Sequence, residues 1–393
     1  MNSQASIDQR ALRAVAVQFL INGAVAASYI PRLPEIRDSL GVDLAVIGQA
    51  LTIASLGGLL GSWLAGRVIT AIGTRQVMIY GTLLLVVLLP MIALASSIWV
   101  LLLVMAAIML VDVIVDVAMN IQGSNLSARR STPVMNRLHG LWSIGSVIGG
   151  VLAASMAALL IPLQWHLLGA AALMAMALWY IGGGLLTSDQ VIPDEGSDKS
   201  GIKKPKARVP ISLWVFAVLG GATFIPEMVA SDWSPFRLSD DLQAGAGLAG
   251  IAYVAFTTGM VAGRLSGDWA SAKLGKDRLL KYAIVVAAIG LGLACLVDYT
   301  PVVFASLTLA GVGISVLFPA LYDNAAQDPH RPAAALGAMT AGSRGAMLIA
   351  PLAIGFLANS SLFSVGMAMA VLALPCLLIV GYLTVRFIHV ERN

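Results

Sequence analysis

Two carboxylates and one amide recur every four residues in a stretch that is otherwise apolar. Asp112, Asp116 and Asn120 lie within residues 110–125, and this spacing places them on one face of a helix. A charge at the centre of a bilayer costs at least ~2.5–3.5 kcal/mol on insertion scales, so such groups normally face a bundle interior or a wet cavity. Asp112 could therefore carry a proton, or it could be a hydrogen-bonded contact between helices.

Arg344 is the basic counterpart of these acids, near the middle of another apolar run. A guanidinium keeps its proton in proteins, so it requires an anion, and Asp112 and Glu227 are the acids that we expect beside it. It acts either as a cationic anchor for an anionic or hydroxyl-rich substrate or as a permanent structural salt bridge. Both roles make it sensitive to substitution, because breaking a buried pair costs roughly 3–5 kcal/mol.

Other polar side chains also interrupt apolar runs. Glu227 follows Pro226, which should bend its helix, so Glu227 either couples protonation to bending or forms an interhelix contact. Asn22 lies near the middle of the first run, one turn after Gln18. Trp142 could stack on a sugar-like or aromatic substrate or pack against helices. The expected substrate and proton pathway is Asp112, Glu227, Arg344, Asn22, Gln18 and Trp142.

A second polar group lies where runs end, on the side of the chain termini. Asp116 and Asn120 precede the connection between the fourth and fifth runs, and residues 322–324 occupy the corresponding place at the end of the tenth. These residues serve as helix caps or as a cytoplasmic gate. His139 beside Arg137 is either a pH-sensitive gate element or a solvated histidine at a helix start. The expected gate is Asp116, Asn120, Arg137, His139, Tyr322, Asp323 and Asn324.

The elements that must position these side chains are membrane helices. Of the 393 residues, 59% are hydrophobic and only 11% are charged, whereas a soluble domain carries roughly 25% charged residues. A span needs about 20 apolar residues, and runs of this length predict an all-α polytopic protein with the lipid bilayer as its partner. The twelve predicted spans are 11–31, 44–68, 77–97, 98–121, 138–160, 163–187, 211–233, 244–268, 279–299, 301–325, 333–358 and 362–386.

The polar break at residues 188–210 divides the spans six and six. Its dense charge and its prolines are typical of a flexible linker. The predicted organisation is therefore an N-terminal six-helix half at 1–187, a cytoplasmic linker at 188–210 and a C-terminal six-helix half at 211–393.

The basic residues predict the orientation. With both termini and the linker on one side, that side holds all of the 24 Lys and Arg residues except Arg32, Arg37, Arg237 and Arg344. Positive residues favour the cytoplasmic side, so we expect a bacterial inner-membrane protein with both termini in the cytoplasm. This asymmetry explains the net charge of +4 without a nucleic-acid partner.

The two halves repeat. Glycines in the second span recur in the eighth, and a constant offset of 202 residues separates each pair, as from Gly57 to Gly259. Glycines four apart let helix backbones approach closely. A parallel repeat of this kind, with a pseudo-two-fold axis along the membrane normal, also relates the two halves of major facilitator transporters. The remaining pairs are Gly61 with Gly263, Gly73 with Gly275 and Gly48 with Gly250.

The chain resembles the major facilitator superfamily over essentially its whole length. Residues 66–75 are similar to the superfamily motif Gly-x-x-x-Asp-Arg-x-Gly-Arg-Arg, but Thr70 stands at the Asp place and Ala71 at the Arg place. Four stretches resemble a bacterial subgroup that includes the rhizopine-locus membrane protein and uncharacterised inner-membrane permeases. They are Pro31-Arg32-Leu33-Pro34-Glu35, Asp116-Val117-Ala118-Met119-Asn120, Arg137-Leu138-His139-Gly140-Leu141-Trp142-Ser143 and Asp232-Trp233-Ser234.

The resemblance implies that helices 1, 2, 4, 5, 7, 8, 10 and 11 line a central cavity, with a substrate site near the midplane. Asp112, Glu227 and Arg344 all fall on such helices. We therefore expect a proton-coupled secondary transporter of a small polar organic solute, sugar-, inositol- or amine-like, working by alternating access as a monomer. The alternatives are a proton-coupled exporter of a drug or metabolite and a membrane sensor or scaffold without transport.

Motifs for other chemistry are absent from the sequence. It contains no Gly-x-x-x-x-Gly-Lys-Ser/Thr phosphate loop, so ATP is not the expected energy source. Its two cysteines, Cys295 and Cys376, lack metal-like spacing. We expect no enzymatic activity, no cofactor and no metal.

Overall fold

The computed structural model describes residues 2–130, 134–187, 211–328 and 331–388, and the predicted linker at 188–210 lies outside them. The described residues contain twelve helical segments that are long and apolar enough to cross a membrane. The predicted all-α fold of twelve spans is therefore confirmed.

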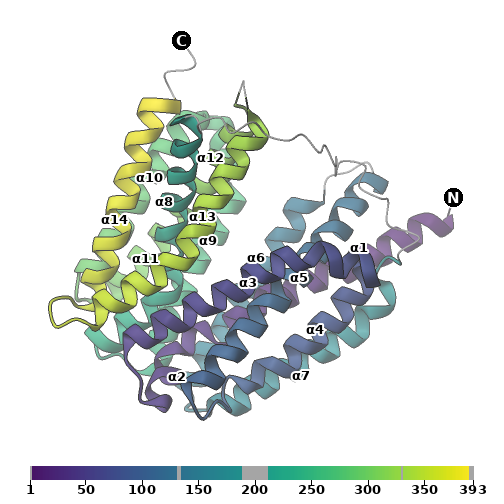
Figure 1. The fold of residues 1–393 in the computed structure, drawn as a ribbon, viewed down its shortest axis with the longest axis horizontal. Coiled ribbons are helices and arrows are strands. Elements are labelled where there is room, and N and C mark those ends of the chain that lie inside the picture. Colours follow the sequence, from purple (N-terminus) through teal and green to yellow (C-terminus); the bar gives the residue numbers. More distant parts are fainter. Residues whose placement is uncertain (1, 131–133, 188–210, 329–330, 389–393) are drawn as a thin grey trace.

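Helices of the first half of the chain form one bundle (Figure 1). Its first span bends after residue 27 and continues through a short 3-10 turn, η1, into α2. The bounds are α1 Asn2–Ala27, η1 Ile30–Arg32, α2 Leu33–Leu40, α3 Leu44–Ile72, α4 Thr74–Met91, α5 Ile98–Arg130, α6 Met135–Ala158, α7 Leu163–Ile181 and η2 Gly182–Gly184.

Helices of the second half form the other bundle. Its tenth span is broken between residues 314 and 317, where Pro319 has no N–H to bond the carbonyl of residue 315. The bounds are α8 Ile211–Phe236, η4 Arg237–Asp241, α9 Ala246–Leu274, α10 Lys276–Leu296, α11 Thr300–Ile314, α12 Leu317–Ala326, α13 Pro332–Asn359, α14 Val365–Leu383 and η5 Thr384–Ile388.

Several helices are longer than the predicted spans. The fourth was expected to end at residue 121, but α5 continues to Arg130. Polar residues end an apolar run, but they do not end the helix when tertiary contacts hold them. Gln122 lies just beyond the run, and its side chain donates to Thr74 Oγ1 and to the Leu186 carbonyl, each at 3.0 Å. Hydropathy thus marks the part of a helix that suits lipid, while tertiary contacts extend the helix beyond it.

The glycine repeat has a direct structural counterpart. A Cβ on Gly57 would lie 2.1 Å from the Ala106 carbonyl oxygen of α5, and a Cβ on Gly259 would lie 2.0 Å from the Thr308 carbonyl oxygen of α11. The contacted residues are therefore also 202 positions apart. Gly73 and Gly275, which end α3 and α9, share positive φ angles of 83° and 80°. The same helix contacts are built twice.

The two bundles touch tightly at one end, which we call the closed end and which contains α2 and η4. A Cβ on Gly48 of α3 would lie 2.4 Å from the Pro351 carbonyl oxygen of α13, and one on Gly247 of α9 would lie 2.5 Å from the Ala158 Cβ of α6. Arg37 of α2 and Asp240 of η4 form an ion pair between the bundles, in which Nη1 and Nη2 each donate to one carboxylate oxygen. The closed end is therefore sealed by backbone packing and by charge.

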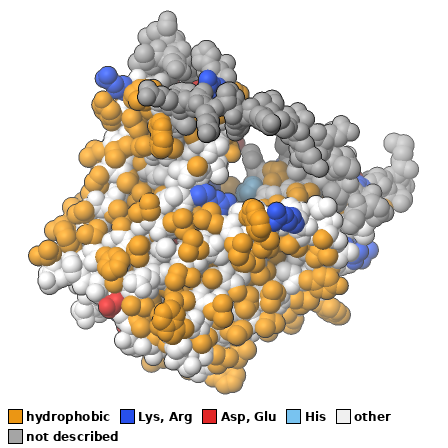
Figure 2. Space-filling model, viewed as in Figure 1, with side chains coloured by type: hydrophobic (Ala, Val, Ile, Leu, Met, Phe, Trp, Pro, Cys, Tyr) orange, Lys and Arg blue, Asp and Glu red, His pale blue; other side chains and the backbone are white. Residues whose placement is uncertain are grey.

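At the opposite end, where α1 begins and α14 ends, the bundles diverge (Figure 1). We call this the open end. On the same interfacial helices, a Cβ added to Gly66 of α3, Gly140 of α6 or Gly345 of α13 would meet no neighbouring part of the described chain within 4 Å. Hydrophobic side chains spread over both bundles in Figure 2, as a surface that faces lipid requires.

The Arg37–Asp240 pair generates a prediction about the closed end. Its side chains are 14% and 22% exposed, so the pair should contribute about 0.5–1 kcal/mol, a two- to fivefold population change. Arg37→Ala or Asp240→Ala should raise the rate at which an impermeant maleimide labels Ala249→Cys, a position that is 1% exposed, in a background without Cys295 and Cys376.

The matched control is Asp38→Ala, because Asp38 also pairs with Arg37 but is 63% exposed and lies on the same helix. This variant should leave the labelling rate unchanged. Equal labelling rates in all three variants would show that the ion pair does not hold the closed end together.

Candidate functional site

A hydrogen-bonded chain links three helices of the first bundle in the interior. The Trp142 indole of α6 donates to Asn22 Oδ1 of α1 at 2.9 Å, and Asn22 Nδ2 donates to Asp112 Oδ1 of α5 at 2.7 Å. Asn22 is 5% exposed, whereas Asp112 is partly exposed. The structure thus brings together three residues of the predicted pathway and orients the Asp112 carboxyl group.

Arg264 of α9 connects the two bundles across this interior. Its Nη2 lies 3.4 Å from Glu227 Oε1 of α8, and its Nη1 lies 3.5 Å from Ser143 Oγ of α6. It also interacts electrostatically with His139. The sequence prediction counted Arg264 among the cytoplasmic charges. Its place inside the predicted span 244–268 was the signal that could have found it.

Three further residues lie on the closed-end side of this region. Tyr29, at the bend after α1, interacts electrostatically with Asp112 and with Asp232 of α8. Tyr253 of α9 interacts with Asp232 and with Tyr29. Sequence reasoning noted Asp232 only as part of a family stretch and missed both tyrosines, because neither carries a charge that stands out in an apolar run.

Arg344 does not have the partners that the sequence predicted. Glu227 pairs with Arg264 instead, and Asp112 bonds to Asn22. Arg344, on α13, interacts electrostatically with Asp116 of α5, and it forms no hydrogen bond or ion pair within 4 Å in the part of the chain that the structure describes. The expected partnership was therefore wrong, although Arg344 does face an acid of the other bundle.

Gln18 lies apart from the polar interior. Its side chain is 0% exposed, and its amide donates to Thr82 Oγ1 of α4 at 2.7 Å. Because α4 is the third span, this bond holds α1 against a helix outside the expected cavity set. A pathway role for Gln18 remains a prediction without a contact to support it.

The residues of the predicted gate form separate contacts in this structure. Asn120 donates to the Asp116 backbone and side chain on the same helix at 2.8 and 3.1 Å. His139 packs edge-on against Phe19 with ring centroids 5.3 Å apart, and Arg137 is exposed. Asp323 pairs with Lys276 at 2.5 Å, and both side chains are more than half exposed, so Asp323 is a surface charge.

The rest of the predicted gate lies on α12. The Tyr322 ring stacks on Phe318 at 5.6 Å between centroids, and Asn324 donates to the Ala320 carbonyl at 2.9 Å. Among the described residues, no hydrogen bond or ion pair joins α12 to Asp116 or Asn120. A paired gate between them would require the open end to close, and it stays a prediction.

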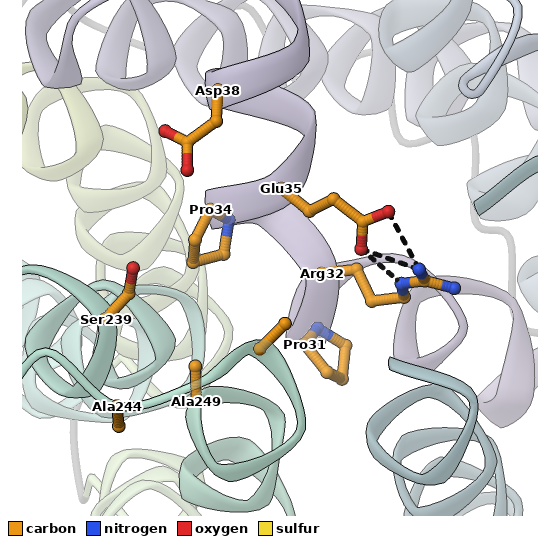
Figure 3. Close-up of a pocket in the computed structure, with 9 residues that line it drawn as sticks. Pro31, Arg32, Pro34, Glu35, Asp38, Ser239, Ala244 and Ala249 are labelled. Atoms are coloured by element: carbon orange, nitrogen blue, oxygen red, sulfur yellow. Dashed lines mark hydrogen bonds and ion pairs between the residues drawn. The ribbon is translucent and has the colours of Figure 1, made fainter. Parts of the chain in front are cut away.

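A cavity of about 280 Å³ lies at the closed end, between α2 and the start of α9 (Figure 3). Its charged side chains are already paired: Arg32 bonds both carboxylate oxygens of Glu35 at 2.8 Å, and Asp38 accepts from Arg37, which also pairs with Asp240 of η4. Arg32 is 3% exposed and also donates to the Ile161 carbonyl. Because the charges of this cavity are already paired, we place the candidate site in the polar interior instead.

The polar interior suits binding and proton exchange. It offers carboxylates, guanidinium groups, hydroxyls and aromatic rings from both bundles. Within the described residues no group of three or more His, Cys, Asp or Glu side chains could hold a metal ion.

Comparisons with known proteins agree on the family. The family model described as Major Facilitator Superfamily matches residues 15–340. An uncharacterized transporter, y4wD, of Sinorhizobium fredii is 28% identical over 92% of this chain and 96% of its own length. An uncharacterized MFS-type transporter of Yersinia pestis is 29% identical over 91% of each chain. The membrane protein MosC of Rhizobium meliloti is 26% identical over 80% of this chain and 75% of its own.

Solved structures support the fold. The crystal structure of the nucleoside transporter NupG matches with a TM-score of 0.75 at 13% identity, covering 98% of this chain and 99% of that one. A bacterial homologue of the human lysosomal transporter Spinster, in an inward-facing and occupied conformation, matches with a TM-score of 0.62 at 14% identity, covering 95% and 94%. At these identities the likeness shows the fold and no substrate.

The Arg264–Glu227 pair can be tested by a double-mutant cycle. Because the side chains are 39% and 27% exposed, screening limits the expected coupling to about 0.5–1 kcal/mol. Arg264→Ala and Glu227→Gln should each lower the melting temperature of the purified protein, and the double variant should lose less than the sum. Arg67→Ala, an exposed arginine on α3, is the control and should be additive with Glu227→Gln. Additivity of the Arg264 and Glu227 substitutions would contradict the pairing.

Proposed function

The chain belongs to the Major Facilitator Superfamily and is a membrane transporter, and we propose that it moves a small polar organic solute by proton-coupled alternating access. The solute is sugar-, inositol- or amine-like. Each chain carries the full set of interior polar groups, so a monomer suffices. The transporter operates in a bacterial inner membrane with both termini in the cytoplasm.

The observation that carries this proposal is the polar interior shared by two bundles that are sealed at one end. Arg264 reaches Ser143 of the first bundle and Glu227 of the second, so a solute bound here would contact both. With cytoplasmic termini, the open end faces the cytoplasm, and this conformation is the inward-facing one. Alternating access then requires closure at the open end and separation of Gly48 from Pro351 at the closed end.

Asp112 is the best candidate for the proton carrier. One of its oxygens accepts from Asn22, while its other oxygen forms no hydrogen bond with any described residue. The group is partly exposed in the interior of a membrane protein, where an ionised carboxylate is costly. Binding of a proton to this oxygen removes the charge of Asp112. The free-energy difference between the two conformations then changes, and this change links proton movement to transport.

Asp112→Asn tests proton coupling in proteoliposomes. The best-stabilising solute from a panel of sugars, cyclitols and amines would be supplied with and without an imposed pH gradient. Uphill accumulation should fall at least tenfold, because the amide cannot release a proton, while exchange of labelled for unlabelled solute continues. Asp277→Asn, which removes an exposed carboxylate on α10, is the control with normal accumulation. Retained uphill transport in Asp112→Asn would remove this residue from coupling.

Arg344→Ala tests a role in solute binding. The substitution leaves Asp116 without its cationic neighbour on α13, and it removes any bond from the guanidinium to a solute hydroxyl. A charge-assisted hydrogen bond contributes about 1.5–3 kcal/mol, so the solute-induced rise in melting temperature should shrink markedly. Arg344→Lys should restore part of it. An unchanged shift with an intact fold would make Arg344 purely structural.

A further inference from the structure

Asp232 is an interior carboxylate that has no cationic partner among the described residues. The charged group that acts on Asp232 is another acid, Glu227, and Glu227 is itself paired with Arg264. The other interior guanidinium, that of Arg344, faces Asp116. Both interior arginines are thus engaged with other acids, and Asp232 stays a centre of uncompensated negative charge.

The Asp232 carboxylate has room for a ligand. One oxygen accepts from the neighbouring Ser231 hydroxyl at 2.6 Å, and its other oxygen has no hydrogen-bond partner among the described residues. The side chain is neither fully buried nor fully exposed. This oxygen is not among the buried polar atoms that are cut off from solvent, so water or a solute can reach it.

Two buried tyrosines lie close enough to the same carboxylate to interact with it electrostatically. Tyr29 of the first bundle is 3% exposed and Tyr253 of the second is 5% exposed, and both interact electrostatically with Asp232. Neither hydroxyl has a hydrogen-bond partner in the described chain, and neither is among the buried polar atoms that are cut off from solvent. Gly150 of α6 makes room for the Tyr253 ring, since a Cβ there would lie 3.0 Å from it. Two buried hydroxyls without a partner among the described residues, one from each bundle, are a second observation that points to a ligand site.

This combination matches an ammonium group. A carboxylate oxygen and two phenol oxygens accept N–H bonds, and the faces of aromatic rings attract cations. A neutral solute would desolvate Asp232 without compensating its charge, and an anion would be repelled by both Asp232 and Glu227. The nearby chain of Trp142 and Asn22 offers polar contacts for the remainder of a hydroxylated molecule.

We propose that the transported solute is an amine that carries a positive charge and that its ammonium group binds Asp232 between Tyr29 and Tyr253. This inference rests on the proposed function and narrows its substrate class from polar solutes to cationic ones. Asp112 remains free for the proton, so the solute and the proton have separate carboxylates.

The test uses matched sets of probes on the purified full-length protein. Glucosamine, glucose and glucuronate share one ring and differ in charge. Ethanolamine, whose ammonium group carries N–H donors, and propan-1-ol form a second, smaller pair of cation and neutral isostere. In at least one set, the cation should bind at least tenfold more tightly than its neutral analogue by titration calorimetry. Equal or tighter binding of the neutral or anionic probes, or no binding of either cation up to 10 mM, would overturn the proposal.

Variants then assign the preference to Asp232. Asp232→Asn should abolish the preference for the cation, whereas Asp232→Glu should keep it, and Asp277→Asn should bind like the unmodified protein. Tyr29→Phe should weaken cation binding severalfold while leaving the neutral analogue unaffected. Should Asp232→Asn fail to fold, Tyr29→Phe and Asp232→Glu still decide. A full cation preference in Asp232→Asn would place the ammonium elsewhere.

Transport measurements separate this inference from the proposed function. If neutral solutes are accumulated and cations are not, the chain is a transporter and the amine inference is wrong. If cations bind through Asp232 but no probe crosses the membrane of proteoliposomes, the amine site stands and the transport proposal fails.

Discussion

The structure depends on one electrostatic constraint: a charged side chain inside a membrane protein needs a counter-charge, a hydrogen-bond partner or water. Arg264 meets it with Glu227 and with Ser143 of the other bundle, and Asp112 meets it with Asn22. Lipid can supply neither partner. These charged groups therefore lie between the bundles, and apolar side chains face the bilayer. The polar interior and the membrane-exposed surface are two results of the same constraint.

Close helix packing provides the second constraint, and the chain satisfies it twice. Gly57 and Gly259 admit the carbonyls of Ala106 and Thr308 at equivalent places in the two bundles. At the closed end, Gly48 brings the bundles themselves together. The same residue type thus stabilises each bundle internally and permits a tight but breakable contact between them, which a rocking motion requires.

The polar interior divides by depth. Asp112, Asn22 and Trp142 form a bonded chain within the first bundle, whereas Tyr29, Tyr253 and Asp232 gather nearer the closed end from both bundles. Asp116 faces Arg344 across the interior. A solute entering from the open end would meet arginines first and the uncompensated carboxylate last, so the field within the interior favours a positive group at the innermost position.

The sequence by itself determined the elements of this protein and which of them carry polarity. Run lengths predicted twelve helices, the glycine offset predicted a repeat, and interrupted runs singled out Asp112, Asn22 and Trp142. Only the tertiary structure decided the partners: Glu227 pairs with Arg264 rather than Arg344, Gln18 bonds Thr82 on α4, and Asp323 meets Lys276 at the surface. Hydropathy and helical periodicity are local properties, whereas each partnership joins helices far apart in the chain whose rotation and depth are fixed by packing.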